Sequence, residues 1–332
     1  MALSPMTTLP QAKAEINTTF SAIHFPTAMT FAGFTDPSGD YGFLLMLKET
    51  GVSTISIITD PIIFQAYKPR YEQLISDARS LGFKIHLINQ MDWKYRLKLI
   101  GLKNPLQTII PPSFSKILAW ETSWMQLYAS YHPDFLSVLA EPSNLNFKMR
   151  KGLTESQVNT LIGSLASTVK QISPETQTWV DLQPQYGIVD YYVGKSAAFI
   201  PNLDGIGWDV YDRDGYAVLA EVMPFAVQAG KLTGITETWR WPLYAKPEYD
   251  KPENAPVEAE WFKELYNQTL AWGVTPSLFN PFFTNKFVLL DPMPTELTAP
   301  AIREYADSLK LAVDLNNRTV IFSAYQLLVT GA

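Results

Sequence analysis

Two glutamates, Glu141 and Glu237, each stand directly after a short apolar run with the length of a β-strand. Residues 135–140 precede Glu141, and residues 234–236 precede Glu237. Two carboxyl groups can divide acid and base work between them when one is protonated and the other is ionised. On either side of a glycosidic bond, one carboxyl protonates the leaving oxygen while the other attacks the anomeric carbon. Whether these two glutamates can do so depends on the elements that carry them.

Apolar runs of strand length alternate with segments of helical periodicity along the chain. We predict strands at residues 28–34, 54–59, 84–89, 135–140, 178–182, 205–210, 232–236 and 275–279. We predict helices at residues 41–49, 69–81, 113–131, 154–172, 196–201, 215–229, 257–272 and 299–314. Strands that alternate with helices in this way indicate a parallel sheet covered by helices.

Eight strand–helix units without a break in composition predict one domain, a single (β/α)8 TIM barrel that spans residues 1–332. In this prediction residues 1–27 form an N-terminal extension, and residues 315–332 form a C-terminal tail that packs on the barrel as a strand or helix. The competing fold is a doubly wound open sheet. It is disfavoured because the first turn, residues 33–39, lacks the Gly-x-Gly-x-x-Gly pattern of nucleotide-binding sheets.

In (β/α)8 barrels the reactive side chains lie at the carboxyl ends of the strands. The fourth and seventh strands are three places apart in a ring of eight, so Glu141 and Glu237 are expected to face each other across its mouth. Tyr211 follows the sixth strand and is expected beside them. Amide, guanidinium and aromatic groups near the other strand ends are candidates for substrate binding. They are Trp93, Asn144, Gln183, Trp239, Arg240 and Trp241, and one of Trp239 and Trp241 is expected to face the cleft.

These segments resemble the clan A retaining glycoside hydrolases, a group of TIM barrels that includes β-mannanases, cellulases, galactanases and β-glycosidases. Ala140-Glu141-Pro142 is similar to the Asn-Glu-Pro segment of that clan, which implies that Glu141 is the acid/base. Residues 236–240, Thr-Glu-Thr-Trp-Arg, resemble the nucleophile segment of mannanase-type members, which implies that Glu237 is the nucleophile. Tyr211 stands where the clan often has a tyrosine bonded to the nucleophile.

The resemblance implies a retaining β-glycoside hydrolase that acts on a poly- or oligosaccharide by double displacement, with no cofactor and no metal. Three positions depart from the clan pattern. Ala140 replaces the usual Asn, Asp60-Pro61 stands where an Arg is common, and Phe279 or Phe282 stands where a Trp often closes the eighth strand.

Two alternatives follow from these departures and from the shared chemistry. The first is a catalytically inactive carbohydrate-binding barrel, which the loss of Asn at Ala140 favours. The second is a transglycosidase that uses the same two glutamates and differs only in how it excludes water. Which sugar and linkage are recognised, and whether action is endo or exo, stays open.

Composition excludes several other functions. The 332 residues contain 26 basic and 32 acidic side chains, and this net charge of −6 argues against a nucleic-acid partner. The absence of cysteine excludes disulfides, thiolate metal sites and a cysteine nucleophile. With three histidines, a multi-histidine metal site is not expected, and His86 is expected to be buried and hydrogen-bonded within the third strand.

The expected partner is a carbohydrate. No window predicts a membrane helix, so no membrane association is expected, and the oligomeric state stays open. No signal peptide is visible at the start of the chain. We expect an extracellular protein whose signal has been trimmed, with the cytoplasm as the alternative.

Overall fold

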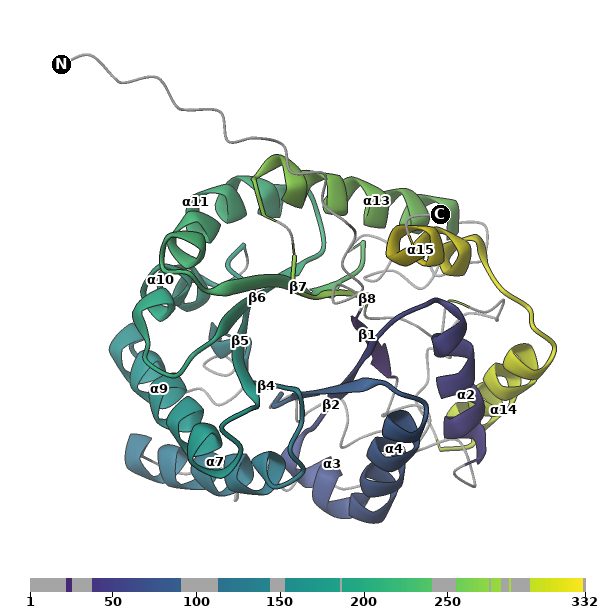
Figure 1. Cartoon of the computed structure of the whole chain (residues 1–332), viewed down its shortest axis with the longest axis horizontal. Helices are drawn as coiled ribbons and strands as arrows, with labels where there is room; N and C mark the ends of the chain where they lie inside the picture. Colours follow the sequence, from purple (N-terminus) through teal and green to yellow (C-terminus); the bar gives the residue numbers. More distant parts are fainter. Residues whose placement is uncertain are drawn as a thin grey trace.

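The computed structural model describes residues 22–25, 38–90, 113–143, 153–185, 187–240, 255–274, 276–281, 287 and 299–330. In this part of the chain one parallel sheet has eight strands in the order of the sequence. The strands are β1 (Ala22–Phe25), β2 (Thr54–Ile58), β3 (Lys84–Ile88), β4 (Phe135–Ala140), β5 (Gln177–Leu182), β6 (Gly205–Val210), β7 (Leu232–Thr238) and β8 (Phe279–Pro281). Strands β1 and β8 contact each other, so the sheet curls into a nearly closed barrel (Figure 1). The predicted (β/α)8 fold is confirmed.

Helices surround the sheet on its outer side (Figure 1). They are α2 (Ser38–Glu49), α3 (Pro61–Ala66), α4 (Lys68–Ser80), α7 (Phe114–Ala129), α9 (Glu155–Ile172), α10 (Ile188–Ser196), the 3-10 helix η2 (Ala197–Phe199), α11 (Asp214–Gln228), α13 (Ala255–Ala271), α14 (Ala299–Asp314) and α15 (Val320–Thr330). Helix α14 packs against α2, and α15, which is the predicted tail, packs against α13.

Some helix ends follow directly from local chemistry. Thr154 and Gln157 form a capping box at the start of α9, in which each side chain bonds to the backbone N–H of the other. Gly51 and Gly82 follow α2 and α4 with φ angles of 81° and 78°. This left-handed conformation is unfavourable for other residues, which is why a glycine after a helical pattern predicts the end of the helix.

The first strand, the fifth helix and helix α3 differ from the prediction, and the eighth strand, predicted at residues 275–279, is β8 at Phe279–Pro281. The first strand is β1 at Ala22–Phe25, within the segment assigned to the extension, and the predicted strand at 28–34 lies outside the described residues. Two apolar runs stand close together there, and the sequence does not indicate which one pairs with β2. The fifth helix is α10, eight residues earlier than predicted, because its β-branched and aromatic residues have weak helix propensity. Helix α3 was not predicted.

Near the amino-terminal ends of the strands, Phe135, Trp179 and Leu278 form a hydrophobic cluster separate from the main core. These residues come from β4, from β5 and from the position before β8, so the cluster joins opposite sides of the ring. Gly205 on β6 lies against the indole of Trp179, and a Cβ on Gly205 would stand 2.4 Å from Cε2 of that ring. Because Gly205 has no side chain, β6 leaves room for the indole of Trp179.

Replacing Gly205 with alanine is expected to lower the free energy of unfolding by about 1–3 kcal/mol, because the close-packed indole must shift. Gly42 in α2 is a matched control, since a Cβ there would meet no atom within 4 Å. Gly42→Ala is expected to raise the free energy of unfolding by about 1 kcal/mol through helix propensity. Urea denaturation of both variants checks this, and equal effects would contradict the packing described for Trp179.

Candidate active site

The structure places Glu141 and Glu237 at the carboxyl ends of β4 and β7. Glu141 directly follows β4, and its backbone N–H donates to the carbonyl oxygen of Asp181 on β5 at 2.8 Å. Its φ angle is 47°, in the left-handed region that non-glycine residues rarely adopt. Glu237 is the penultimate residue of β7 and is partly exposed. Both glutamates are therefore where the residues of a barrel active site are expected.

Each of these two strands is irregular just before its glutamate. The pairing of β4 with β5 shifts by one residue between Ser137 and Leu139. The pairing of β7 with β6 shifts between Ile235 and Glu237, the residues that pair with Trp208 and Asp209. Such bulges turn the side chains that follow them and are common next to active sites. Both glutamates therefore follow a local change in strand pairing.

Tyr211 is hydrogen-bonded to one of the two glutamates, Glu237. It follows β6, and its hydroxyl donates a hydrogen bond to Oε1 of Glu237. Burial raises the pKa of Tyr211 well above its usual value, and the charges of Glu237 and Glu141 raise it further. The phenol thus keeps its proton and remains a donor. Tyr211 and Glu237 are therefore direct partners, and the charge of Glu141 at the end of β4 acts on the same buried phenol.

Two buried aspartates lie beside this site. Asp209 on β6 pairs in register with Glu237 on β7. Burial raises the pKa of Asp209 well above its usual value, and the charge of Glu237 is the next largest cause. Burial also raises the pKa of Asp181 on β5 to about 7, against the lowering effect of its hydrogen bonds. Together with Glu141 they form a band of four carboxyl groups at the ends of β4 to β7.

A chain of hydrogen bonds leads to this band from the other side of the barrel. His86 Nδ1 bonds to the hydroxyl of Ser56 at 2.9 Å, and His86 Nε2 bonds to the hydroxyl of Ser137 at 2.8 Å. Ser137 in turn donates to Oδ1 of Asp181 at 2.8 Å. The prediction that His86 is buried and hydrogen-bonded is confirmed. These hydrogen bonds give partners to buried polar groups that would otherwise be costly to bury.

Thr236 occupies the space between the two buried aspartates. Its hydroxyl donates to Oδ1 of Asp209 at 3.0 Å and also bonds to the carboxyl of Asp181. Gly207 allows this approach, since a Cβ there would lie 2.3 Å from Thr236 Oγ1 and 2.7 Å from Asp181 Oδ1. This hydroxyl lowers the pKa of both carboxyl groups, against the larger raising effect of their burial.

The predicted binding residues are only partly described. Gln183 is half-buried, and its backbone N–H donates to Asp190 at 2.9 Å. Arg240 is half-buried, three residues after Glu237, and its backbone N–H donates to Glu258 at 3.0 Å. Trp93, Asn144 and Trp241 lie outside the described residues, as does Phe282.

Trp239 requires a correction. Its side chain is 1% exposed and packs edge to face against Phe262 of α13, with the ring centroids 5.7 Å apart. The next residue, Arg240, is bonded through its backbone N–H to Glu258 of α13, so the indole lies in the core between β7 and this helix. It presents no face to a sugar. The prediction that one of Trp239 and Trp241 faces the cleft now depends on Trp241.

Sequence reasoning did not single out four buried acidic residues near the site: Asp181, Asp190, Asp209 and Glu258. Asp181 and Asp209 occupy the penultimate positions of β5 and β6, each directly after a tryptophan or valine and before an apolar residue. A charged residue is almost never fully buried unless it is paired. An aspartate inside an apolar strand was therefore a usable signal. Asp190 and Glu258 are in the first turns of α10 and α13, where acidic residues are common, so their sequence context carried no such signal.

Because Glu258 is buried, the free energy of unfolding is expected to depend on pH. Burial raises its pKa to about 8, against the lowering effect of the backbone N–H and the charge of Arg240. The folded protein therefore binds a proton more tightly than the unfolded chain. The free energy of unfolding is expected to fall as pH rises from about 4.5 to about 8. Glu258→Gln, which stays neutral, is expected to remove part of this decline, on the order of 1–3 kcal/mol.

Urea denaturation from about pH 4 to about pH 8.5 spans both values and measures that slope. Glu260→Gln, which alters an exposed glutamate on the same helix, controls for the loss of a surface charge. A Glu258→Gln slope equal to that of the unaltered protein would contradict the burial of an ionisable carboxyl at this position.

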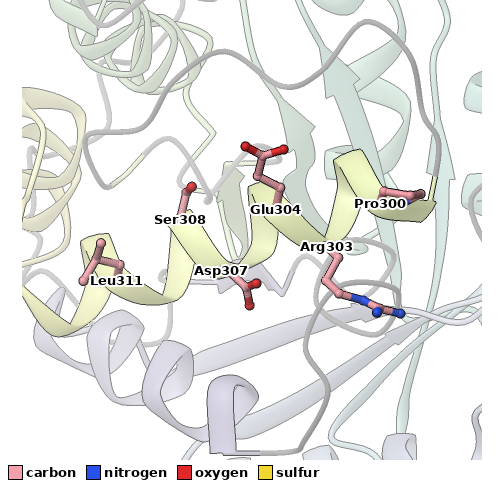
Figure 2. A pocket seen from close by; sticks show the side chains of 6 residues that line it. All are labelled: Pro300, Arg303, Glu304, Asp307, Ser308 and Leu311. Carbon is pink, nitrogen blue, oxygen red and sulfur yellow. The ribbon is translucent and has the colours of Figure 1, made fainter.

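A hollow of about 560 Å³ lies along α14 (Figure 2). The lining residues that the structure describes all come from this one helix: Pro300, Arg303, Glu304, Asp307, Ser308 and Leu311. Their side chains point in different directions along the helix and do not converge on a point (Figure 2). The described part of the lining therefore offers no converging polar groups that would orient a ligand.

Among the residues that the structure describes, no helix is long and apolar enough to cross a membrane. The same residues contain no group of three or more His, Asp or Glu side chains arranged to hold a metal ion.

Solved structures resemble this one in fold. The endo-1,4-β-mannanase from Rhizomucor miehei matches with a TM-score of 0.55 and 10% identity over 87% of this chain and 94% of that chain. A GH10 endoxylanase from a sugarcane soil metagenome matches with a TM-score of 0.57 and 10% identity over 93% and 97% of the two chains. The exo-β-1,4-mannosidase from Opitutaceae bacterium strain TAV5 has a TM-score of 0.61 and 10% identity over 90% of this chain and 59% of that chain.

No protein-family model matches the chain, and no curated protein matches its sequence. The chain shares a TIM-barrel fold with these glycoside hydrolases. At 10% identity the similarity extends to the fold alone.

Proposed function

We propose that the protein is a retaining β-glycoside hydrolase that acts on a poly- or oligosaccharide by double displacement. The observation that supports this most directly is the placement of Glu141 and Glu237 at the carboxyl ends of β4 and β7. Tyr211 is hydrogen-bonded to Glu237, and the charges of both glutamates raise its pKa. Two carboxyl groups from different strands at one barrel mouth are the groups that glycoside hydrolysis requires.

In the first step Glu237 attacks the anomeric carbon, and Glu141 donates its proton to the oxygen of the leaving sugar. The C–O bond breaks, and a covalent bond forms between the sugar and Glu237. In the second step Glu141 takes a proton from water, the water oxygen attacks the anomeric carbon, and Glu237 leaves as a carboxylate. The Tyr211 hydroxyl, bonded to Oε1 of Glu237, directs the other oxygen of that carboxylate toward the sugar.

A second function, binding of carbohydrate without hydrolysis, is supported by Ala140. The residue before Glu141 has no group that could hydrogen-bond to a sugar hydroxyl. A transglycosidase would use the same two glutamates and transfer the sugar to an acceptor other than water.

Release of reducing sugar from β-mannan, β-1,4-xylan, β-glucan and β-1,4-galactan tests the proposal. The panel follows from structural neighbours described as mannanase, xylanase and galactanase. Proton NMR of the first product should show the β-anomer, because two displacements restore the starting configuration. Binding to one of these polymers without release of sugar would favour the binding function. Transfer to added oligosaccharide in preference to water would favour the transglycosidase.

A further inference from the structure

Asp190, which takes no part in the proposed chemistry, joins the segment after Glu141 to the segment after β5. It lies in the first turn of α10 and is fully buried. Its Oδ1 accepts the backbone N–H of Ser143 at 2.6 Å, and its Oδ2 accepts the backbone N–H of Gln183 at 2.9 Å. In return, the backbone N–H of Asp190 donates to Ser143 Oγ at 3.0 Å. These bonds hold α10 and both segments together.

The close approach of these segments depends on Gly187, the residue before α10. A Cβ on Gly187 would lie 2.1 Å from Ser143 Oγ, so any larger residue would push Ser143 away. The backbone N–H of Gly187 also donates to the carbonyl of Gln183 at 3.1 Å. Ser143 therefore packs directly against the residue that precedes α10.

Glu141 needs support of this kind. Its left-handed backbone, with φ of 47°, costs on the order of 1–3 kcal/mol and persists only where the surroundings determine it. On one side, the backbone N–H of Glu141 is bonded to the carbonyl of Asp181. On the other side, Ser143 is bonded to Asp190 only two residues later. The two anchors bracket Glu141 and set the direction in which its side chain leaves the backbone.

We propose that Asp190 is a positioning residue for Glu141, which it aims at the leaving oxygen by holding Ser143 and Gln183. This inference rests on the proposed function, in which Glu141 acts as acid and base. Asp190 acts through the backbone and does not touch the substrate. Burial raises the pKa of Asp190 to about 6, and the negative charge of Glu141 contributes to this rise.

Asp190→Asn tests the proposal, because asparagine has one acceptor oxygen where two backbone N–H groups need one each. We expect kcat/KM to fall roughly 10- to 100-fold on glycosides with poor leaving groups, which need a well-placed acid. On dinitrophenyl glycosides of the same sugar, which leave without protonation, kcat/KM is expected to change little. Equal losses on both substrates, or no loss on either, would overturn the proposal.

Asp204→Asn is the matched control. Asp204 Oδ2 also accepts a backbone N–H, that of Thr178 at 2.8 Å, but it does so at the opposite end of the strands. We expect the ratio of kcat/KM between the two substrates to stay unchanged. Should Asp190→Asn fail to fold, Ser143→Ala removes only the bond between Asp190 N–H and Ser143 Oγ. The same preference for good leaving groups, in a milder form, is expected.

Hydrogen exchange decides the role of Asp190 even if the protein hydrolyses nothing. We expect peptides that contain Ser143 and Gln183 to exchange faster in Asp190→Asn than in the unaltered chain, and no such change in Asp204→Asn. Absence of hydrolysis by the unaltered chain would defeat the proposed function alone. Unchanged exchange in Asp190→Asn would overturn the inference whether or not the protein is active.

Discussion

Glu237→Gln is expected to lower kcat by roughly 10⁴- to 10⁶-fold, the range observed when a group that acts in covalent catalysis is removed. Glutamine has nearly the same shape as glutamate, so the fold should persist, and the Tyr211 hydroxyl can still donate to the remaining oxygen. What is lost is the negative charge that attacks the anomeric carbon. Initial rates on the substrate identified in the polysaccharide panel, with thermal unfolding as a test of the fold, measure the effect.

Tyr211→Phe is the companion variant for Glu237→Gln. It keeps the carboxylate and removes only the hydrogen bond to Oε1. A loss of about 10- to 100-fold in kcat is expected, which corresponds to a hydrogen bond to a charged group. If Glu237→Gln retained as much activity as Tyr211→Phe, the nucleophile would have to be another residue.

Glu141→Ala is expected to produce a loss that depends on the leaving group. For sugars and other poor leaving groups, kcat/KM should fall roughly 10²- to 10⁴-fold, the usual contribution of a general acid. For dinitrophenyl glycosides, kcat/KM should change little because the leaving group needs no proton. A series of aryl glycosides with graded leaving groups measures this difference.

The second step gives an independent check on Glu141. With dinitrophenyl glycosides, kcat of Glu141→Ala should be low because water attacks the intermediate without a general base. Azide needs no base, so adding it should raise kcat and give a glycosyl azide with the β-configuration. A uniform loss across all leaving groups, with no effect of azide, would exclude Glu141 as the acid/base.

The elements that could be predicted are those with local signals. Strands β4 and β6 have the predicted bounds because each is a largely apolar run between polar turns. The start of α9 follows from the capping box of Thr154 and Gln157. Strand β1 was misplaced because choosing between two neighbouring apolar runs requires knowing which one pairs with β2.

The candidate site could also be predicted only in part, namely where the signal is local. Glu141 and Glu237 could be placed at strand ends, since their positions follow from the strands that carry them. The pairing shifts in β4 and β7 could not be predicted, because register depends on the neighbouring strands. The bonds from Asp190 to Ser143 and Gln183 join residues 47 and 7 positions apart, and no pattern in the sequence connects them.

The glycines on one wall of the barrel have a consequence for how its sequence can vary. Gly205 and Gly207 leave space that Trp179, Asp181 and Thr236 occupy from neighbouring strands. Position 205 can gain volume only if position 179 loses it, so the two positions should covary among homologues. A library that randomises positions 179 and 205 together should recover folded pairs that neither single-site library contains.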